Sequence, residues 1–198
     1  MLSSISPFGE RSRNSRWWVT VTAYLLGSTL GGITSGLTAG LVGQLTLGWL
    51  SPTGALWVFA ALCLIGAAME LGLVGLRIPT IHRQVNEDWL TTYRGWVYGT
   101  GFGFQLGLGW ATIVTTSAVW LTWAAALLSG SWQAGLLIGA TFGLSRGAVI
   151  FATRRIHDPA SLRALFRIIA AQAPAVSRLA TAAVGLAALT AIAGVLAA

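Results

Sequence analysis

The sequence predicts an all-α integral membrane protein with about five transmembrane helices, helix packing through glycine ridges, and one interfacial amphipathic helix. Only 9% of the residues are charged, whereas soluble domains carry roughly 25%. Three runs contain no charged side chain, at 17–69, 95–145 and 179–198. A spanning helix needs about 20 apolar residues. The first two runs can therefore hold two helices each, and the third can hold one.

Glycine recurs at four-residue intervals in two of the expected helices. The two ridges are Gly95, Gly99, Gly103 and Gly107, followed by Gly135, Gly139, Gly143 and Gly147. On an α-helix this spacing places the glycines on one face. A face without side chains lets a second backbone approach closely, and such contacts hold helices together in lipid. The pattern predicts a tightly packed bundle of the glycine-zipper kind.

The chain divides into a basic cytoplasmic N-terminal tail, 1–16, and a single polytopic transmembrane domain, 17–198. The expected spans are 18–44, 55–76, 96–128, 132–153 and 176–197.

The third apolar stretch is longer than one span requires, because it continues from Gly95 to Leu128. Such a stretch must tilt strongly, break, or extend beyond the bilayer. Thr112, Thr115 and Thr116 mark the expected break, since their hydroxyl groups can satisfy carbonyls that an irregular backbone leaves without a partner.

Two polar segments, 77–94 and 154–175, are too charged to span and are expected at the cytoplasmic surface. In the second, Asp158 is suited to cap a helix that starts at Pro159. Its apolar and basic residues fall on different faces, which predicts a short amphipathic helix in the membrane interface. Pro174 is expected to end that helix.

Arginine is confined to alternate connections between the spans, apart from Arg146. The connections 45–53 and 129–131 contain no charge, while these residues lie in the others: Arg11, Arg13, Arg16, Arg77, Arg83, Arg94, Arg154, Arg155, Arg163, Arg167 and Arg178. By the positive-inside rule, the N-terminus is cytoplasmic and the C-terminus is outside the cell (inner) membrane. The net charge of +7 does not indicate nucleic acid, because the arginines are scattered among short loops.

Glu70 and Arg146 are charged residues that lie well inside the expected spans. Such residues usually face the protein interior and often mark a pathway or a pair. Both lie at similar depth near the inner ends of their helices, so we expect them to pair. The pair would be either a structural ion pair or a gate.

Gln44 and Gln105 are further polar groups within the spans. Interhelical hydrogen bonding is the simplest interpretation. The alternative is a water-accessible cavity that they line together with Thr112, Thr115 and Thr116.

Known catalytic patterns are missing from the sequence. Cys63 is the only cysteine, which excludes an intramolecular disulfide, a CxxC shuttle and a cysteine metal cluster. Walker, Rossmann, HExxH and catalytic-triad patterns are also absent. We expect no enzyme activity, no metal and no cofactor.

An internal repeat is an open alternative. Gly27 and Gly99 begin similar glycine-rich helices, and Ile81-His82 recurs as Ile156-His157. Sequence rich in glycine and alanine also produces such matches by chance.

The stretch GFGFQLGLGWATIVTTSAVWLTWAAALLSGSWQAGLLIGATFGLSRG resembles the second half of the CcdA/DsbD transmembrane thiol-reductant transporters, and AYLLGSTLGGITSGLTAG resembles their first helix. The family places Pro-Cys where this chain has Ala111-Thr112 and, in the other half, Ser35-Gly36. It also has six spans in two inverted triplets, for which this chain has no room. The resemblance therefore implies a related helix scaffold without the redox chemistry.

Two functions remain open for a non-enzymatic polytopic protein. It either transports a small solute or forms the membrane subunit of a larger complex. The alternative from the resemblance is a degenerate component of a transmembrane thiol-redox or cytochrome c biogenesis system that relies on a partner's cysteines. The expected partners are the lipid bilayer and another membrane protein or a second copy of the chain.

Overall fold

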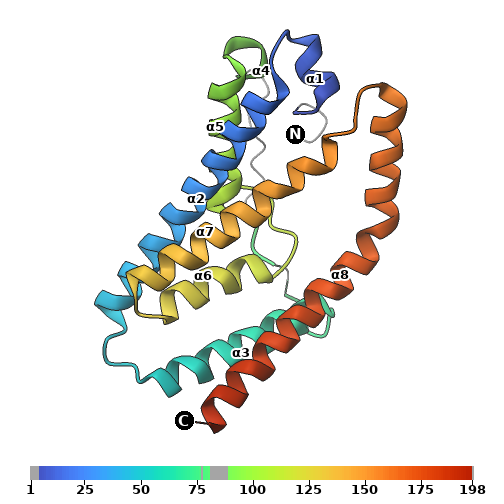
Figure 1. The fold of residues 1–198 in the computed structure, drawn as a ribbon. Coiled ribbons are helices and arrows are strands. Elements are labelled where there is room, and N and C mark those ends of the chain that lie inside the picture. Colours follow the sequence, from blue (N-terminus) through green and yellow to red (C-terminus); the bar gives the residue numbers. More distant parts are fainter. Residues whose placement is uncertain (1–4, 77, 81–88, 198) are drawn as a thin grey trace.

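A computed structural model describes residues 5–76, 78–80 and 89–197. These residues form an all-helical structure (Figure 1). The elements are α1 (Pro7–Ser12), α2 (Trp17–Thr46), α3 (Pro52–Glu70), α4 (Trp89–Thr92), α5 (Gly95–Leu108), α6 (Ala118–Leu128), α7 (Trp132–Ala148), the 3-10 helix η1 (Val149–Thr153) and α8 (Pro159–Leu196). Helices α2, α3, α8 and α7 continued by η1 are long and apolar enough to cross a membrane, and α6 is a shorter apolar helix. The predicted fold class is confirmed.

Helix α2 lies between α5 and α7 and joins them through glycine. A Cβ atom added at Gly36 would meet the Gly135 carbonyl oxygen, and one added at Gly107 would meet the Ser28 carbonyl oxygen, both under 3.0 Å. Real Cβ atoms essentially never come this close to another backbone. Both predicted glycine ridges thus pack on the same helix, on neighbouring faces that meet at Ser28, whose carbonyl oxygen lies against both Gly107 and Gly143.

The contacts along the ridges fix the helix directions. Gly99 and Gly107 on α5 approach Thr20 and Ser28 on α2 in the same order, so these two helices are parallel. Along α7, Gly135 approaches Gly36 while Gly143 approaches Ser28, so α7 is antiparallel to α2.

The parallel pair bears on the proposed repeat. Gly27 meets the backbone of Thr100 and Phe104, and Gly103 meets the backbone of Tyr24 and Ser28 in the same manner. Gly27 therefore corresponds in its packing to Gly103 rather than to Gly99. Close contact of two parallel small-residue helices gives this arrangement with or without duplication, so the repeat stays a prediction.

The third expected span is broken. Helix α5 ends at Leu108, α6 begins at Ala118, and residues 109–117 between them are not helical. The break predicted at Thr112–Thr116 is confirmed. Gly109 begins it with a φ of +79°, a conformation that glycine adopts without strain. Beyond the break, the carbonyl of Leu127 on α6 lies against Gly43 near the far end of α2.

Helices α3 and α8 form a second, antiparallel pair. Its core contains the buried residues Cys63, Val184 and Ala188. Glu70 at the end of α3 contacts Thr181, whereas Leu56 near the start of α3 lies against Gly194. Helix α3 ends at Glu70, six residues before the predicted boundary, because the turn at 71–75 contains Gly72 at a φ of +70°.

The prediction that Pro174 ends an amphipathic helix is wrong. A single helix of 38 residues, α8, passes through Pro174, and it bends along its length in Figure 1. A proline removes one backbone hydrogen bond and favours a kink, while the surrounding alanines favour helix on both sides. The predicted cap is confirmed, since Asp158 accepts hydrogen bonds from the N–H groups of Ala160 and Ser161 at 2.8 Å. The bond from Ser161 is the main reason that the pKa of Asp158 lies below its ordinary value.

The described part of the N-terminal segment is folded rather than a tail. Ile5 is buried, and its carbonyl accepts a hydrogen bond of 3.1 Å from the Thr153 hydroxyl. The Phe8 N–H donates to the carbonyl of Ile156 at 3.1 Å. Helix α1 is thereby fixed to the chain that follows α7.

Candidate functional site

The candidate site is the helix break, defined here as residues 109–117. The segment 78–80 packs along it: the Val114 N–H donates to the Thr80 hydroxyl at 2.8 Å, and the Trp120 indole donates to the Pro79 carbonyl at 2.9 Å. Thr112 closes a local turn by donating to the Gly109 carbonyl at 3.4 Å. The backbone groups that the break releases are therefore partly satisfied by side chains, which non-helical backbone in a membrane protein needs wherever water is absent.

Glu70 binds the end of the helix break that leads into α6. One carboxylate oxygen accepts hydrogen bonds from the backbone N–H and the hydroxyl of Ser117, both at 2.7 Å. The other oxygen accepts from the Thr181 hydroxyl at 2.8 Å. The N-terminus of a helix carries partial positive charge and favours an anion. Glu70 therefore joins α3, α6 and α8 at one point.

Arg146 binds the other end of the helix break. Its Nη2 donates to the Thr112 hydroxyl at 3.0 Å, and its guanidinium lies 5.6 Å from the centre of the Phe142 ring. Its Nη1 is buried and has no hydrogen-bond partner in the described part of the chain.

The predicted pair between Glu70 and Arg146 does not form among the described residues, because each side chain binds its own end of the helix break. The N–H groups at the start of α6 attract the carboxylate, and the Thr112 hydroxyl accepts from the guanidinium. The two charges therefore act on the same segment without meeting.

The remaining predicted polar residues do not all line the cavity that contains Gln44. Exposed Gln44 lines a cavity of about 550 Å³ between the ends of α2, α3 and α6, together with residues such as Leu47 and Phe59. Neither Gln105 nor the threonines Thr112, Thr115 and Thr116 line this cavity. Gln105 is half-buried on α5, and Thr115 is exposed. Residues 81–88, which belong to the expected surface segment 77–94, lie outside the described residues.

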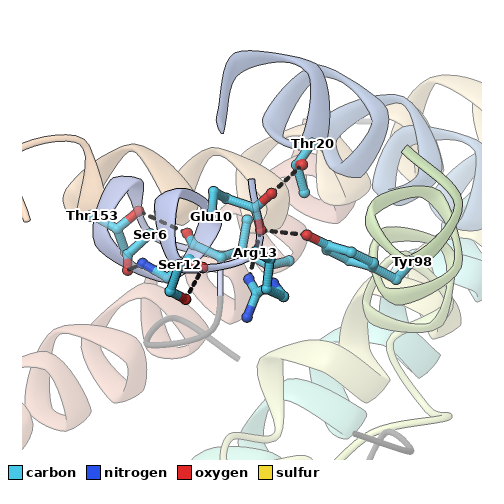
Figure 2. A network of polar contacts seen from close by, with 9 residues as sticks. Ser6, Glu10, Ser12, Arg13, Thr20, Tyr98 and Thr153 are labelled. Atoms are coloured by element: carbon cyan, nitrogen blue, oxygen red, sulfur yellow. Dashed lines mark hydrogen bonds and ion pairs between the residues drawn. The ribbon is translucent and has the colours of Figure 1, made fainter. Parts of the chain in front are cut away.

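Glu10 forms a polar cluster that sequence reasoning missed (Figure 2). It is fully buried, and one carboxylate oxygen accepts from the Tyr98 hydroxyl at 2.6 Å and from Arg13 Nη2 at 2.7 Å. The other oxygen accepts from the Thr20 hydroxyl at 2.7 Å. Burial opposes the charge of Arg13, but the bond to Glu10 leaves the pKa of Arg13 above its ordinary value. Two features of the sequence could have indicated this cluster. Ser6-Pro7 begins a helix, and Glu10 is the only acidic residue before Glu70.

Replacing Glu10 with alanine is expected to detach α1 from α2 and α5. The substitution removes three hydrogen bonds to a buried carboxylate, and a hydrogen bond to a charged group contributes about 1.5–3 kcal/mol. We expect a clear fall in the midpoint of thermal unfolding in detergent. Glu10→Gln keeps the shape of the side chain and should lose less. An unchanged midpoint for Glu10→Ala would contradict the role of the cluster.

Comparison with known proteins finds relatives of this chain, but no family model matches it. Over 147 residues the chain is 30% identical to "Methylamine utilization protein MauF" of Paracoccus versutus, an overlap of 73% of this chain and 54% of the relative. The chain is similar to MauF proteins. The MauF of Methylorubrum extorquens is 31% identical over 147 residues, covering 74% of this chain and 51% of the relative. That of Paracoccus denitrificans is 32% identical over 151 residues, covering 73% and 53%.

The similarity to MauF proteins is confined to part of each relative. This chain spans about half the length of the relatives it matches. No family model and no solved structure matches it significantly. With its long apolar helices, the chain is a multi-pass membrane protein homologous to MauF proteins.

Proposed function

We propose that this chain is a MauF-type membrane component of a methylamine-utilisation system. In this proposal it has no enzyme activity of its own. It provides a helix scaffold similar to that of the CcdA/DsbD transporters, and a partner supplies the cysteines for any thiol chemistry.

The similarity to MauF proteins over about three quarters of the chain carries this proposal. The helix break supports its second part. The CcdA/DsbD family resemblance places Pro-Cys at Ala111-Thr112, and these positions lie inside the break between α5 and α6. In this chain the position has an irregular backbone, and it carries a threonine bound to Arg146 in place of a thiol.

Cys63 does not replace the missing thiols. It is fully buried on α3 and packs in the core shared with α8. A thiol in an apolar core behaves as a small hydrophobic side chain. Electron transfer through this chain would therefore need cysteines from another protein.

A solute transporter receives less support from the geometry. That hypothesis predicts a water-accessible cavity lined by Gln105, Thr112, Thr115 and Thr116, and none of these residues lines the cavity of about 550 Å³ beside Gln44. We therefore place the chain in a complex rather than in a solute pathway.

Purification of the tagged chain from native membranes tests the complex. Free thiols are alkylated before extraction in mild detergent, and co-purifying proteins are identified by mass spectrometry. We expect a stoichiometric partner with a cysteine pair, and Cys63→Ala should retain it in full. A stable monomer would overturn the proposal, as would loss of the partner from Cys63→Ala.

A growth experiment tests the link to methylamine. Deletion of the gene from its native host should impair growth on methylamine while growth on ammonium and an organic acid is unchanged. A plasmid-borne copy should restore growth. Equal growth of the deletion strain on both media would contradict the assignment.

The proposed orientation places the N-terminus in the cytoplasm and the C-terminus outside. The parallel α2 and α5 both begin beside arginine-containing segments, and the antiparallel α7 ends at another. Alkaline phosphatase fused after Ala197 should be active, because this enzyme folds outside the inner membrane. A β-galactosidase fusion at the same position should be inactive. The reverse pattern would contradict the orientation.

A further inference from the structure

Two buried N–H donors border the turn Gly109–Thr112 without a hydrogen-bond partner in the described part of the chain. They are Nη1 of Arg146 and the indole Nε1 of Trp123. Buried polar groups are nearly always hydrogen-bonded, so each exception needs a physical explanation. Here two exceptions occur beside the same turn.

The contacts of the turn place both donors next to it. The Trp123 indole nitrogen would lie 3.0 Å from a Cβ atom on Gly109, and its ring packs edge-on against Phe142 at 4.8 Å between centres. The guanidinium of Arg146 lies over the same Phe142 ring and binds Thr112. Gly109 and Thr112 are themselves joined by a hydrogen bond of 3.4 Å.

Arg146 also lacks a counter-charge among the described residues. The carboxylate of Glu70 is bound to Ser117 and Thr181, and that of Glu10 is bound to Arg13. The guanidinium is partly buried, and a charge withdrawn from water without a counter-charge is unfavourable, especially within a membrane. An anion at the turn would offset the charge and accept from both free N–H groups.

We propose that the turn Gly109–Thr112 binds a small monovalent anion, of carboxylate or halide chemistry, held by Arg146 and Trp123. The guanidinium supplies the charge and one N–H, and the indole supplies a second, neutral N–H. Glycine at position 109 matters because a Cβ would press against Trp123 and Phe142. This site stands independently of the MauF-type function.

Anion-dependent thermal stability of the purified protein tests the site. Sodium formate or sodium chloride is titrated at constant ionic strength against sodium 2-(N-morpholino)ethanesulfonate, whose anion is too bulky for the turn. We expect the unfolding midpoint of the wild-type protein to rise to saturation with formate, with chloride, or with both. A difference between the two arms identifies the preferred anion.

Variants separate binding at the turn from a general salt effect. Trp123→Phe keeps the ring and removes only the N–H, so half-saturation should require about tenfold more anion. Arg146→Gln should abolish the response, and the exposed Arg178→Gln should respond like the wild type. A wild-type midpoint independent of the anion, as when only water fills the turn, would overturn the proposal. So would equal responses in wild type, Trp123→Phe and Arg178→Gln.

Discussion

Gly36→Ala is expected to prevent α2 and α7 from packing, and to abolish the folded protein in detergent. The added methyl group would lie against the carbonyl oxygen of Gly135, and also under 3.0 Å from the backbone of Gly139. Backbone cannot rotate away as a flexible side chain can, so the two helices would have to separate. In lipid, helices associate through close packing of this kind together with interhelical hydrogen bonds, so the expected loss is large.

The matched control for Gly36→Ala is Gly185→Ala on α8. A Cβ at Gly185 would meet nothing within 4 Å. Alanine favours helix over glycine by about 1 kcal/mol, so this variant should be as stable as the wild type or slightly more stable. Size-exclusion chromatography and thermal unfolding of both variants provide the comparison. If Gly36→Ala behaves like Gly185→Ala, the α2–α7 contact is not what holds the bundle together.

The glycine ridges could be predicted because their spacing is a local property of one helix. Gly135, Gly139, Gly143 and Gly147 are all buried in the structure, as a packing face requires. What the spacing could not supply was the partner. Gly36 and its neighbours give α2 small residues on more than one face, and only the folded chain shows that α5 packs on one of these faces and α7 on the next.

The prediction that Glu70 and Arg146 pair rested on their similar depth in the membrane. Two residues at the same depth meet only if their helices are neighbours, and the sequence contains no information on lateral position. Helix α3 pairs with α8, whereas α7 packs on α2. The break was predicted from its threonines, but its ability to bind two opposite charges from different helices depends on tertiary structure.

Sequence reasoning also failed for the short polar segments around Glu10 and Pro174. Glu10 lies among basic residues in a segment whose composition predicts exposure to solvent, yet it is buried against Tyr98 and Thr20. Pro174 presented the opposite case, since a strong local signal was overridden by the helix on both sides. Helix α8 buries Val184, Ala188 and Ala191 only after this proline, and residues 163–179 are largely exposed in the isolated chain. That exposure is consistent with a lipid or protein environment for this half of the helix.

Glu70→Ala is expected to separate the α3–α8 pair from the start of α6. The substitution removes three hydrogen bonds to a carboxylate, at 2.7, 2.7 and 2.8 Å. A hydrogen bond to a charged group contributes about 1.5–3 kcal/mol to stability. The N–H of Ser117, left without its acceptor, adds a desolvation cost. Glu70 is only half-buried, so water replaces part of these bonds, and we expect a net loss of about 3 kcal/mol in the free energy of unfolding, measured by denaturant titration in mixed micelles.

Thr181→Ala is the partner variant for Glu70→Ala, because it removes only the contact with α8. It should cost about half as much, and adding it to Glu70→Ala should cause little further loss, since the shared bond is already gone. Full additivity would mean that Glu70 does not couple α3 to α8. Hydrogen exchange adds a spatial readout: Glu70→Ala should raise exchange at the start of α6, whereas Thr181→Ala should leave Ser117 protected. Equal exchange at Ser117 in Glu70→Ala and the wild type would show that the carboxylate does not hold the helix break in place.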